Sequence, residues 1–161
     1  MPGPSIISAA CNEELVIFEV KGLASMNNSE SMYQMVRECS AKGVVNVCID
    51  LEGCEGIDST FMGTLLLIHE EAEAKKGSLY VVNVNDFILG KLEELGVGEI
   101  INIDCDKELP PLNFTKLPDT NDESARMSLI LKAHEKLVTE NSENAEKFNS
   151  FIKALKGSFK K

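Results

Sequence analysis

The sequence lacks several features that mark whole classes of protein. It contains no tryptophan, and aromatic residues make up only 6% of the chain. No stretch approaches the roughly 18 consecutive apolar residues of a membrane-spanning helix. Residues 1–5 also lack the basic start and the apolar block of a secretory signal. We therefore expect a cytoplasmic protein that does not enter a membrane.

Basic residues are scarce relative to acidic ones, with 16 Lys and Arg against 26 Asp and Glu and a net charge of −10. Residues 1–116 hold 8 basic and 19 acidic residues, a net charge of −11, whereas residues 117–161 hold 8 and 7, a net charge of +1. Nucleic-acid binding depends mainly on clustered Lys and Arg, so we predict no nucleic-acid partner. The acidic charge suits a basic protein partner, or it serves only to keep the protein soluble.

Patterns that bind metals or cofactors are missing as well. The cysteines are odd in number and form no C-x-x-C pair, which argues against a disulfide framework, a zinc site or a redox pair, and we predict reduced, mainly buried thiols: Cys11, Cys39, Cys48, Cys54 and Cys105. His69 and His134 have no companion ligands, so we assign them to packing or the surface rather than to a metal. No glycine-rich nucleotide motif is present, and no cofactor is predicted.

Alternating strand and helix patterns predict an α/β fold. The chain is long enough for one domain with an appendage. Apolar periodicity and turn residues predict strands and helices in this order: strands 5–10 and 15–21, helix 29–41, strand 44–51, helix 60–76, strand 79–82, helix 87–95 and strand 99–103. This order predicts a mixed, mostly parallel sheet of four to five strands with crossover helices.

The C-terminal part differs in composition. Prolines in residues 109–118 exclude regular helix and central strand, and predict a linker that is strapped over the domain or free of it. Residues 119–161 predict a helical hairpin, whose second helix carries Phe148, Phe151 and Phe159 on one stripe. These rings require cover from the domain, from a second copy in a homodimer, or from a partner. The domain organisation is therefore 1–108, 109–118 and 119–161.

The most informative stretch runs from residue 48 to residue 63. It reads as a buried strand, a glycine-bearing loop and the start of a helix, with Asp58 and Ser59 at the helix N-terminus. One interpretation is that these side chains only cap the helix. The other is that Ser59 is phosphorylated, since free amides and the helix dipole tolerate a phosphate there, while its charge changes the surface that a partner reads.

These residues resemble the signature of the STAS domain, which is named for sulfate transporters and anti-sigma factor antagonists. The resemblance rests on Ile49-Asp50-Leu51, a glycine-bearing loop, then Ile57-Asp58-Ser59-Thr60 and a helix containing Gly63. It extends over roughly residues 5 to 105 and implies a STAS-like sheet, with the helical tail as an addition to the minimal domain.

The resemblance to anti-sigma factor antagonists also implies a function in bacterial transcription regulation. Ser59 would be phosphorylated by an anti-sigma factor that is a serine kinase, and a PP2C-type phosphatase would reverse the reaction. The unphosphorylated form would bind the kinase and release its sigma factor. The implied partner surface consists of Asp58, Ser59, Thr60, Met62 and Gly63 with Ser25 and Asn27 of a preceding loop. No catalysis is implied, and Ser59→Asp is expected to weaken partner binding with little change in melting temperature.

Two alternatives remain open. The chain could be a STAS-like structural or scaffold subunit of a signalling or lipid-transport assembly, in which Ser59 is only a helix cap. It could also be a hydrolase with Ser59 as the nucleophile. That reading requires an activating base, and the sequence shows neither a G-x-S-x-G elbow nor a convincing histidine partner.

Overall fold

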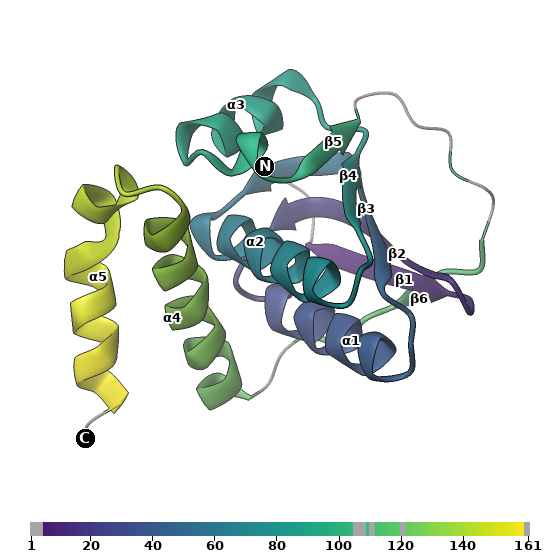
Figure 1. The fold of residues 1–161 in the computed structure, drawn as a ribbon, viewed down its shortest axis with the longest axis horizontal. Helices are drawn as coiled ribbons and strands as arrows, with labels where there is room; N and C mark the ends of the chain where they lie inside the picture. Colours follow the sequence, from purple (N-terminus) through teal and green to yellow (C-terminus); the bar gives the residue numbers. More distant parts are fainter. Residues whose placement is uncertain (1–4, 105–108, 110–111, 120–121, 160–161) are drawn as a thin grey trace.

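A mixed sheet lies at the centre of the molecule and carries helices on one face (Figure 1). The structure is a computed structural model, and it describes residues 5–104, 109, 112–119 and 122–159. Within these residues the sheet has six strands in the order β5-β4-β3-β2-β1-β6. The predicted α/β class with a mostly parallel sheet is confirmed.

The sheet begins with a hairpin of β1 (Ile6–Cys11) and β2 (Leu15–Ala24), which pair antiparallel. The alternation predicted for β2 is seen in its burial, because Val16, Phe18 and Val20 are fully buried. Parallel pairing then adds β3 (Asn46–Ile57), β4 (Leu79–Val82) and β5 (Asn102–Asp104). The sheet therefore places the carboxyl ends of β2 and β3 side by side.

Helices connect the parallel strands, as βαβ connections require. The crossovers are α1 (Ser29–Ala41), α2 (Ser59–Ala74) and α3 (Asp86–Glu94), the last followed by the short 3-10 helix η1 (Val97–Glu99). Gly96 has a positive φ of 76° at the end of α3, a conformation that glycine adopts without steric cost. Helices α1 and α2 bury their apolar stripes against the sheet and close the main core.

Two predicted elements have different bounds in the structure. Residues 52–57 were expected to form a loop, but they extend β3, because β2 continues to Ala24 alongside them and supplies backbone partners. The predicted strand 99–103 is a 3-10 turn followed by β5 at Asn102–Asp104. Ile101 is buried within that turn, so the run of isoleucines reflects burial rather than a longer strand.

The described part of the linker lies against the domain. Thr115–Lys116 form β6, which pairs antiparallel with β1, and the Ser31 hydroxyl donates to the carbonyl of Pro118 at 2.7 Å. Leu109 and Phe114 pack on the sheet face opposite the helices. Of the two arrangements that the sequence left open, the strapped one is observed for these residues.

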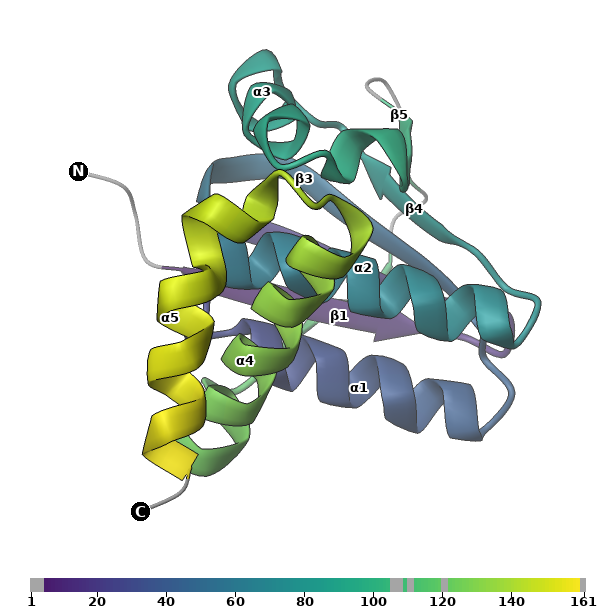
Figure 2. The ribbon, with the colours of Figure 1, turned by 60° about the vertical axis from the view of Figure 1, so that its left-hand side comes forward.

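The C-terminal hairpin, which we define as α4 (Glu123–Glu140) and α5 (Asn144–Phe159), forms a further layer on the helical face. Figure 2 shows that α4 crosses α2 and that α5 lies on the outer side of α4. Leu137 of α4 belongs to the main core, and Phe148 of α5 packs against that core. No helix of the described residues is long and apolar enough to cross a membrane.

Candidate functional site

The N-terminus of α2 is built around Asp58, which links three segments. Asp58 Oδ1 accepts the amide of Phe61 at 2.8 Å, so the side chain is the N-cap of α2. Its Oδ2 accepts the amide of Met26 at 2.8 Å, and its own amide donates to the carbonyl of Ala24 at 2.9 Å. One carboxylate therefore ties the end of β2 and the following loop to the start of α2.

Burial of Asp58 affects its protonation. Removal from water raises the pKa of this carboxyl, while the amides of Phe61 and Met26 act in the opposite direction by stabilising the charged form. The net direction is upward, so the charge on Asp58 carries an energetic cost in the folded state. This cost matters for Ser59, because a second negative group beside Asp58 would add repulsion.

The loop between β2 and α1 contributes the exposed part of the site. Asn27 is exposed and Ser25 is half-buried, with the Ser25 hydroxyl accepting the Asn27 amide at 3.2 Å. Leu23 and Met26, which flank Ser25, are exposed large apolar residues. Met26, which lies between the predicted residues Ser25 and Asn27 in the sequence, donates its amide to Asp58. The structure therefore places Ser25 and Asn27 next to Asp58.

Ser59 is the first residue of α2, is half-buried, and contacts a histidine that sequence reasoning did not pair with it. The Ser59 Oγ lies 2.8 Å from Nε2 of His134, and Nδ1 of the same ring lies 2.7 Å from the carbonyl oxygen of Ile130. Because a carbonyl can only accept, Nδ1 carries the hydrogen of the neutral ring. Nε2 is then an acceptor, and the Ser59 hydroxyl donates to it.

His134 is enclosed on the inner side of α4. It is 3% exposed, and the rings of Phe148 and Phe151 pack edge-on against it with centroids 4.9 and 4.8 Å away. Burial lowers the pKa of the imidazole, with the Ile130 carbonyl and the Asp58 charge acting in the opposite direction. The neutral tautomer inferred above is consistent with this direction.

The expectation that Ser59 has no histidine partner was therefore wrong. The two residues are 75 positions apart, and only the packing of α4 on α2 brings them together. The predicted role of His134 in packing is observed in addition to this polar contact. A histidine inside an apolar helical stripe was the available signal, because a buried imidazole requires hydrogen-bond partners.

Three other predicted site residues are buried. Thr60 and Met62 are 4% and 5% exposed, and Gly63 is buried. Gly63 meets the backbone of α4 so closely that a Cβ at this position would lie 2.3 Å from the carbonyl oxygen of Ala133. The role of these three residues in partner binding stays a prediction, and for Gly63 it requires movement of α4.

The chemistry of the site is that of a shielded hydroxyl. A serine that donates to a neutral imidazole resembles half of a nucleophile–base pair. The phenylalanine rings, however, cover the imidazole, so a substrate cannot reach it in this arrangement. No group of three or more metal-binding side chains occurs in the described ranges.

The fold is similar to that of solved anti-sigma factor antagonists. SpoIIAA in its unphosphorylated form is 17% identical, with a TM-score of 0.54 over 61% of this chain and 86% of that one. The phosphorylated form of this Bacillus cell fate determinant gives a TM-score of 0.51 at 18% identity, over 61% of this chain and 89% of that one. A Thermotoga maritima protein proposed to be an anti-sigma factor antagonist is 20% identical, with a TM-score of 0.55 over 62% of this chain and 85% of that one.

These similarities concern the sheet and its crossover helices. No curated protein shows a significant match to the sequence. The family model of the STAS domain, in contrast, matches residues 7–108, which include every strand from β1 to β5 and the Asp58–Ser59 helix start. The match covers well over half of the chain, and the protein therefore belongs to the STAS domain family.

Proposed function

We propose that this protein is a cytoplasmic, phosphorylation-controlled binding module of the anti-sigma factor antagonist type, from a bacterium. One observation carries the proposal: Ser59 is the first residue of α2, directly after the N-cap Asp58, within the matched STAS domain. Its partners would be an anti-sigma factor with serine kinase activity and a PP2C-type phosphatase. The unphosphorylated form would bind the kinase.

The surroundings of Ser59 support a protein partner. Leu23, Met26 and Asn27 are exposed beside Asp58, so the site presents both apolar side chains and hydrogen-bonding groups. Residues 1–116 carry a net charge of −11, which favours a partner with a basic surface. A phosphate on Ser59 would add about −1.5 to −2 charges and a bulky, hydrated group at the position that a partner contacts, and would oppose binding by occupying that position.

Catalysis by this chain is not part of the proposal. The His134 ring is 3% exposed and lies against two phenylalanine rings, so a substrate has no direct path to the base. A test is labelling with a fluorophosphonate, a reagent for activated serines. We expect no labelling of Ser59, and stoichiometric labelling would support the hydrolase alternative instead.

Substitutions at Ser59 test the proposed switch, but they also affect the folded state. Ser59→Asp was expected to leave the melting temperature near that of the wild type. Because the Ser59 hydroxyl donates to His134, the aspartate would instead face the unprotonated Nε2 without a hydrogen, and we now expect a lower melting temperature. Ser59→Cys is the better unphosphorylatable control, since its thiol keeps a weak donor.

The binding experiment compares the wild type, Ser59→Cys and the protein with phosphoserine installed at position 59. Binding is measured by calorimetry against the serine-kinase anti-sigma factors of the source organism. We expect the first two proteins to bind with similar affinity and the phosphoprotein to bind at least about tenfold more weakly. Equal affinities for all three proteins would contradict the proposal.

The structure also favours a second candidate, a STAS-like scaffold subunit in which Ser59 is structural. The observation is that Ser59 and Gly63 both contact α4, so the family's partner surface is occupied by the chain itself. Intact-mass and peptide mass spectrometry of protein purified from its native cell separates the two candidates. A phosphorylated fraction at Ser59 supports the switch, whereas its absence under all growth conditions supports the scaffold.

A further inference from the structure

The C-terminal hairpin lies over the half of α2 that begins with Ser59 (Figure 2). It is added to the matched domain, which ends at residue 108. A kinase that modifies Ser59 needs the hydroxyl in its own active site, and this hydroxyl donates to His134 within the interface. The hairpin and a protein that binds at Ser59 therefore compete for the same surface.

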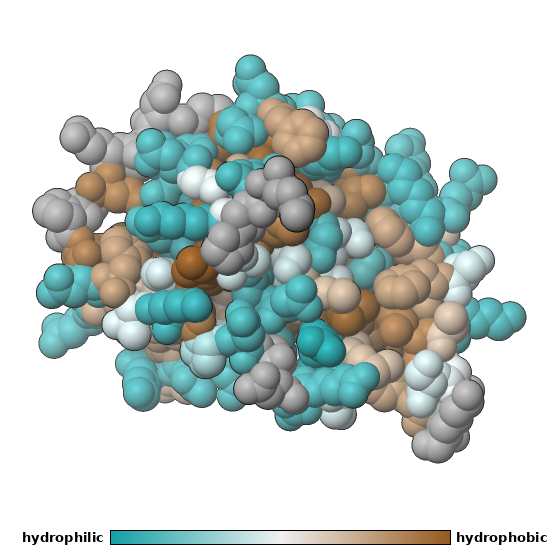
Figure 3. Space-filling model, turned by 180° about the vertical axis from the view of Figure 1, so that it is seen from behind, coloured by the Kyte–Doolittle hydropathy of each residue, from teal (hydrophilic) through white to brown (hydrophobic). Residues whose placement is uncertain are grey.

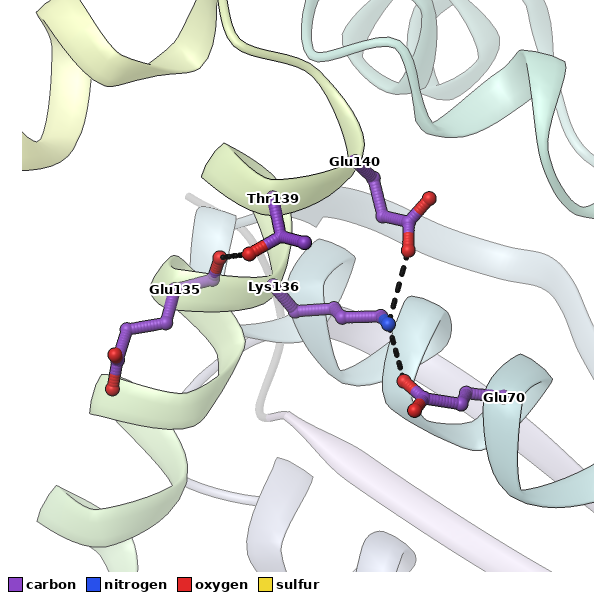
Figure 4. Close-up of polar contacts among 5 residues, drawn as sticks. All are labelled: Glu70, Glu135, Lys136, Thr139 and Glu140. Carbon is purple, nitrogen blue, oxygen red and sulfur yellow. Dashed lines mark hydrogen bonds and ion pairs between the residues drawn. The ribbon is translucent and has the colours of Figure 1, made fainter.

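Several contacts besides the one between Ser59 and His134 hold the hairpin on the domain. Ala133 lies against Gly63, where the two helix backbones approach most closely. Lys136 of α4 reaches across to Glu70 of α2 and also pairs with Glu140 at 3.0 Å (Figure 4). At the turn of the hairpin, the Asn144 side-chain amide donates to the carbonyl of Leu95 at 2.9 Å.

The charged contact is stable at neutral pH. Burial disfavours the charge on Lys136, but its hydrogen bonds with Glu70 and Glu140 outweigh this effect and raise its pKa. The lysine therefore remains protonated, and the contact does not depend on Ser59. Phosphorylation would directly remove one contact between the hairpin and α2, the hydrogen bond from the Ser59 hydroxyl to His134.

Most of the buried residues of the C-terminal hairpin belong to α4. This helix buries Leu129, Ile130, Ala133, His134 and Leu137. In α5 only Asn144 and Ile152 are buried, while Phe151 and Phe159 are 43% and 46% exposed. Seen from behind, apolar side chains gather on the side of the molecule where α4 and α5 lie (Figure 3). The outer helix is therefore held by α4, and release of α4 would release both.

A phosphate on Ser59 does not fit this interface. The Ser59 Oγ is 2.8 Å from Nε2, so a phosphorus atom cannot enter between these two atoms while they remain in contact. The ester oxygen has no hydrogen to donate, so the hydrogen bond from Ser59 to the neutral ring is lost. The half-buried carboxylate of Asp58 adds like-charge repulsion.

We propose that the C-terminal hairpin is a displaceable cover of the Ser59 surface, and that phosphorylation of Ser59 releases it. The inference rests on the proposed function for the source of the phosphate. In that step the Ser59 oxygen bonds to the γ-phosphorus of ATP, the bond to ADP breaks, and the hydroxyl proton passes to a base of the kinase. Release exposes the face of α2 at Gly63 that contacts Ala133.

Hydrogen exchange of the full-length protein tests the release without any kinase. Phosphoserine is installed genetically at position 59, and the control carries phosphoserine at Ser150, an exposed position on α5 with the same added charge. We expect amide exchange in residues 129–137 and 59–66 to accelerate at least about tenfold in the first protein only. Exchange in β2 and β3 is expected to stay slow.

Two results would overturn the inference. One is unchanged exchange in residues 129–137 when position 59 is phosphorylated. The other is a loss of protection throughout the sheet, which would show global destabilisation instead of release of the hairpin. The protein with phosphoserine at position 150 should show the same amide exchange as the unmodified chain. If its exchange accelerates as much as that of the protein with phosphoserine at position 59, the specific role of Ser59 is contradicted.

His134→Ala provides an independent measurement, because it removes the acceptor without adding charge. We expect it to loosen residues 129–137, and phosphoserine 59 to add less in this background than in the wild type, since both changes act on one contact. Fully additive effects would contradict the inference. If installed phosphoserine releases the hairpin but native Ser59 carries no phosphate, the inference about the hairpin stands and only the proposed function is rejected.

Discussion

At the scale of single residues, His134 joins the added helices to the family's motif. Its ring accepts from Ser59, donates to Ile130 and packs against Phe148 and Phe151. The imidazole must remain neutral for this arrangement, because a protonated Nε2 could no longer accept the serine hydrogen. Docking of the hairpin should therefore depend on pH.

The first prediction concerns this pH dependence. Burial lowers the pKa of His134, so the released or unfolded chain binds a proton at pH values where the docked chain does not. Docking is fully favoured above about pH 6.5, the ordinary pKa of histidine. It weakens as the pH falls from there through the lowered pKa of the docked His134 ring. NMR signals of α4 should show exchange broadening that grows as the pH is lowered from about 6.5 to about 5.5 in the wild type.

His134→Gln is the control, since its amide does not titrate. Asp58 also faces the ring, and its raised pKa acts in the opposite direction, because protonation of a buried carboxyl favours the folded state as the pH falls. The variant should therefore lose the weakening at low pH. The same pH dependence in both proteins would rule out His134 as the titrating group.

The second prediction separates the capping role of Asp58 from its charge. Asp58→Asn keeps an acceptor for the Phe61 amide but loses the acceptor for the Met26 amide, while it also removes a half-buried charge, so we expect the free energy of unfolding to fall by less than about 1 kcal/mol. Asp58→Ala loses the cap and the contact with Met26, at a cost of about 1–2 kcal/mol. Urea denaturation measures both, and equal losses would show that the charge itself stabilises the fold.

At the scale of elements, the crossing of α2 and α4 depends on one glycine. Gly63 lets the two backbones meet, and any side chain there would push α4 outward. In our third prediction, Gly63→Ala accelerates amide exchange in α4 and lowers the free energy of unfolding by about 1–3 kcal/mol, as overpacking does. This loss outweighs the better helix propensity of alanine, which is about 1 kcal/mol.

Gly157→Ala in α5 is the matched control, because a Cβ at that position meets nothing within 4 Å. It introduces the same substitution within the hairpin without changing the α2–α4 contact. We expect unchanged exchange in α4 and equal or slightly higher stability. An equal loss in both variants would mean that the effect of Gly63→Ala does not arise from contact with Ala133.

At the scale of the whole molecule, the hairpin completes the apolar packing. Leu137 is fully buried in the main core, although it lies outside the matched domain. Our fourth prediction is that a chain ending at residue 117 melts at least about 10 °C below the full chain, because it exposes the apolar surface of α2 that α4 covers. Differential scanning calorimetry measures this shift.

A chain ending at Asn141 retains α4 and is the comparison for this truncation. Its melting temperature should fall less, since α5 buries only two residues. Light scattering on the same proteins tests the homodimer prediction, which concerns the exposed Phe151 and Phe159. A dimer that becomes a monomer when α5 is removed would support it, and an unchanged mass would contradict it.

The sequence by itself determined the α/β class, the order of the crossover helices and the start of α2 at Asp58–Ser59. Periodicity and capping are local properties, so they can be read from neighbouring residues. Local patterns did not reveal that β3 continues to Ile57. That extension depends on pairing with β2, which lies far away in the sequence.

Only the tertiary structure decided that the added helices cover Ser59 and Gly63. Helical periodicity predicted that α4 and α5 have apolar faces, but it did not specify the surface against which they pack. The close approach of Ala133 to Gly63 aligns α4 across α2, and this alignment places His134 beside Ser59. Such a contact depends on the shapes of two helices that meet in space, which no pattern along the chain encodes directly.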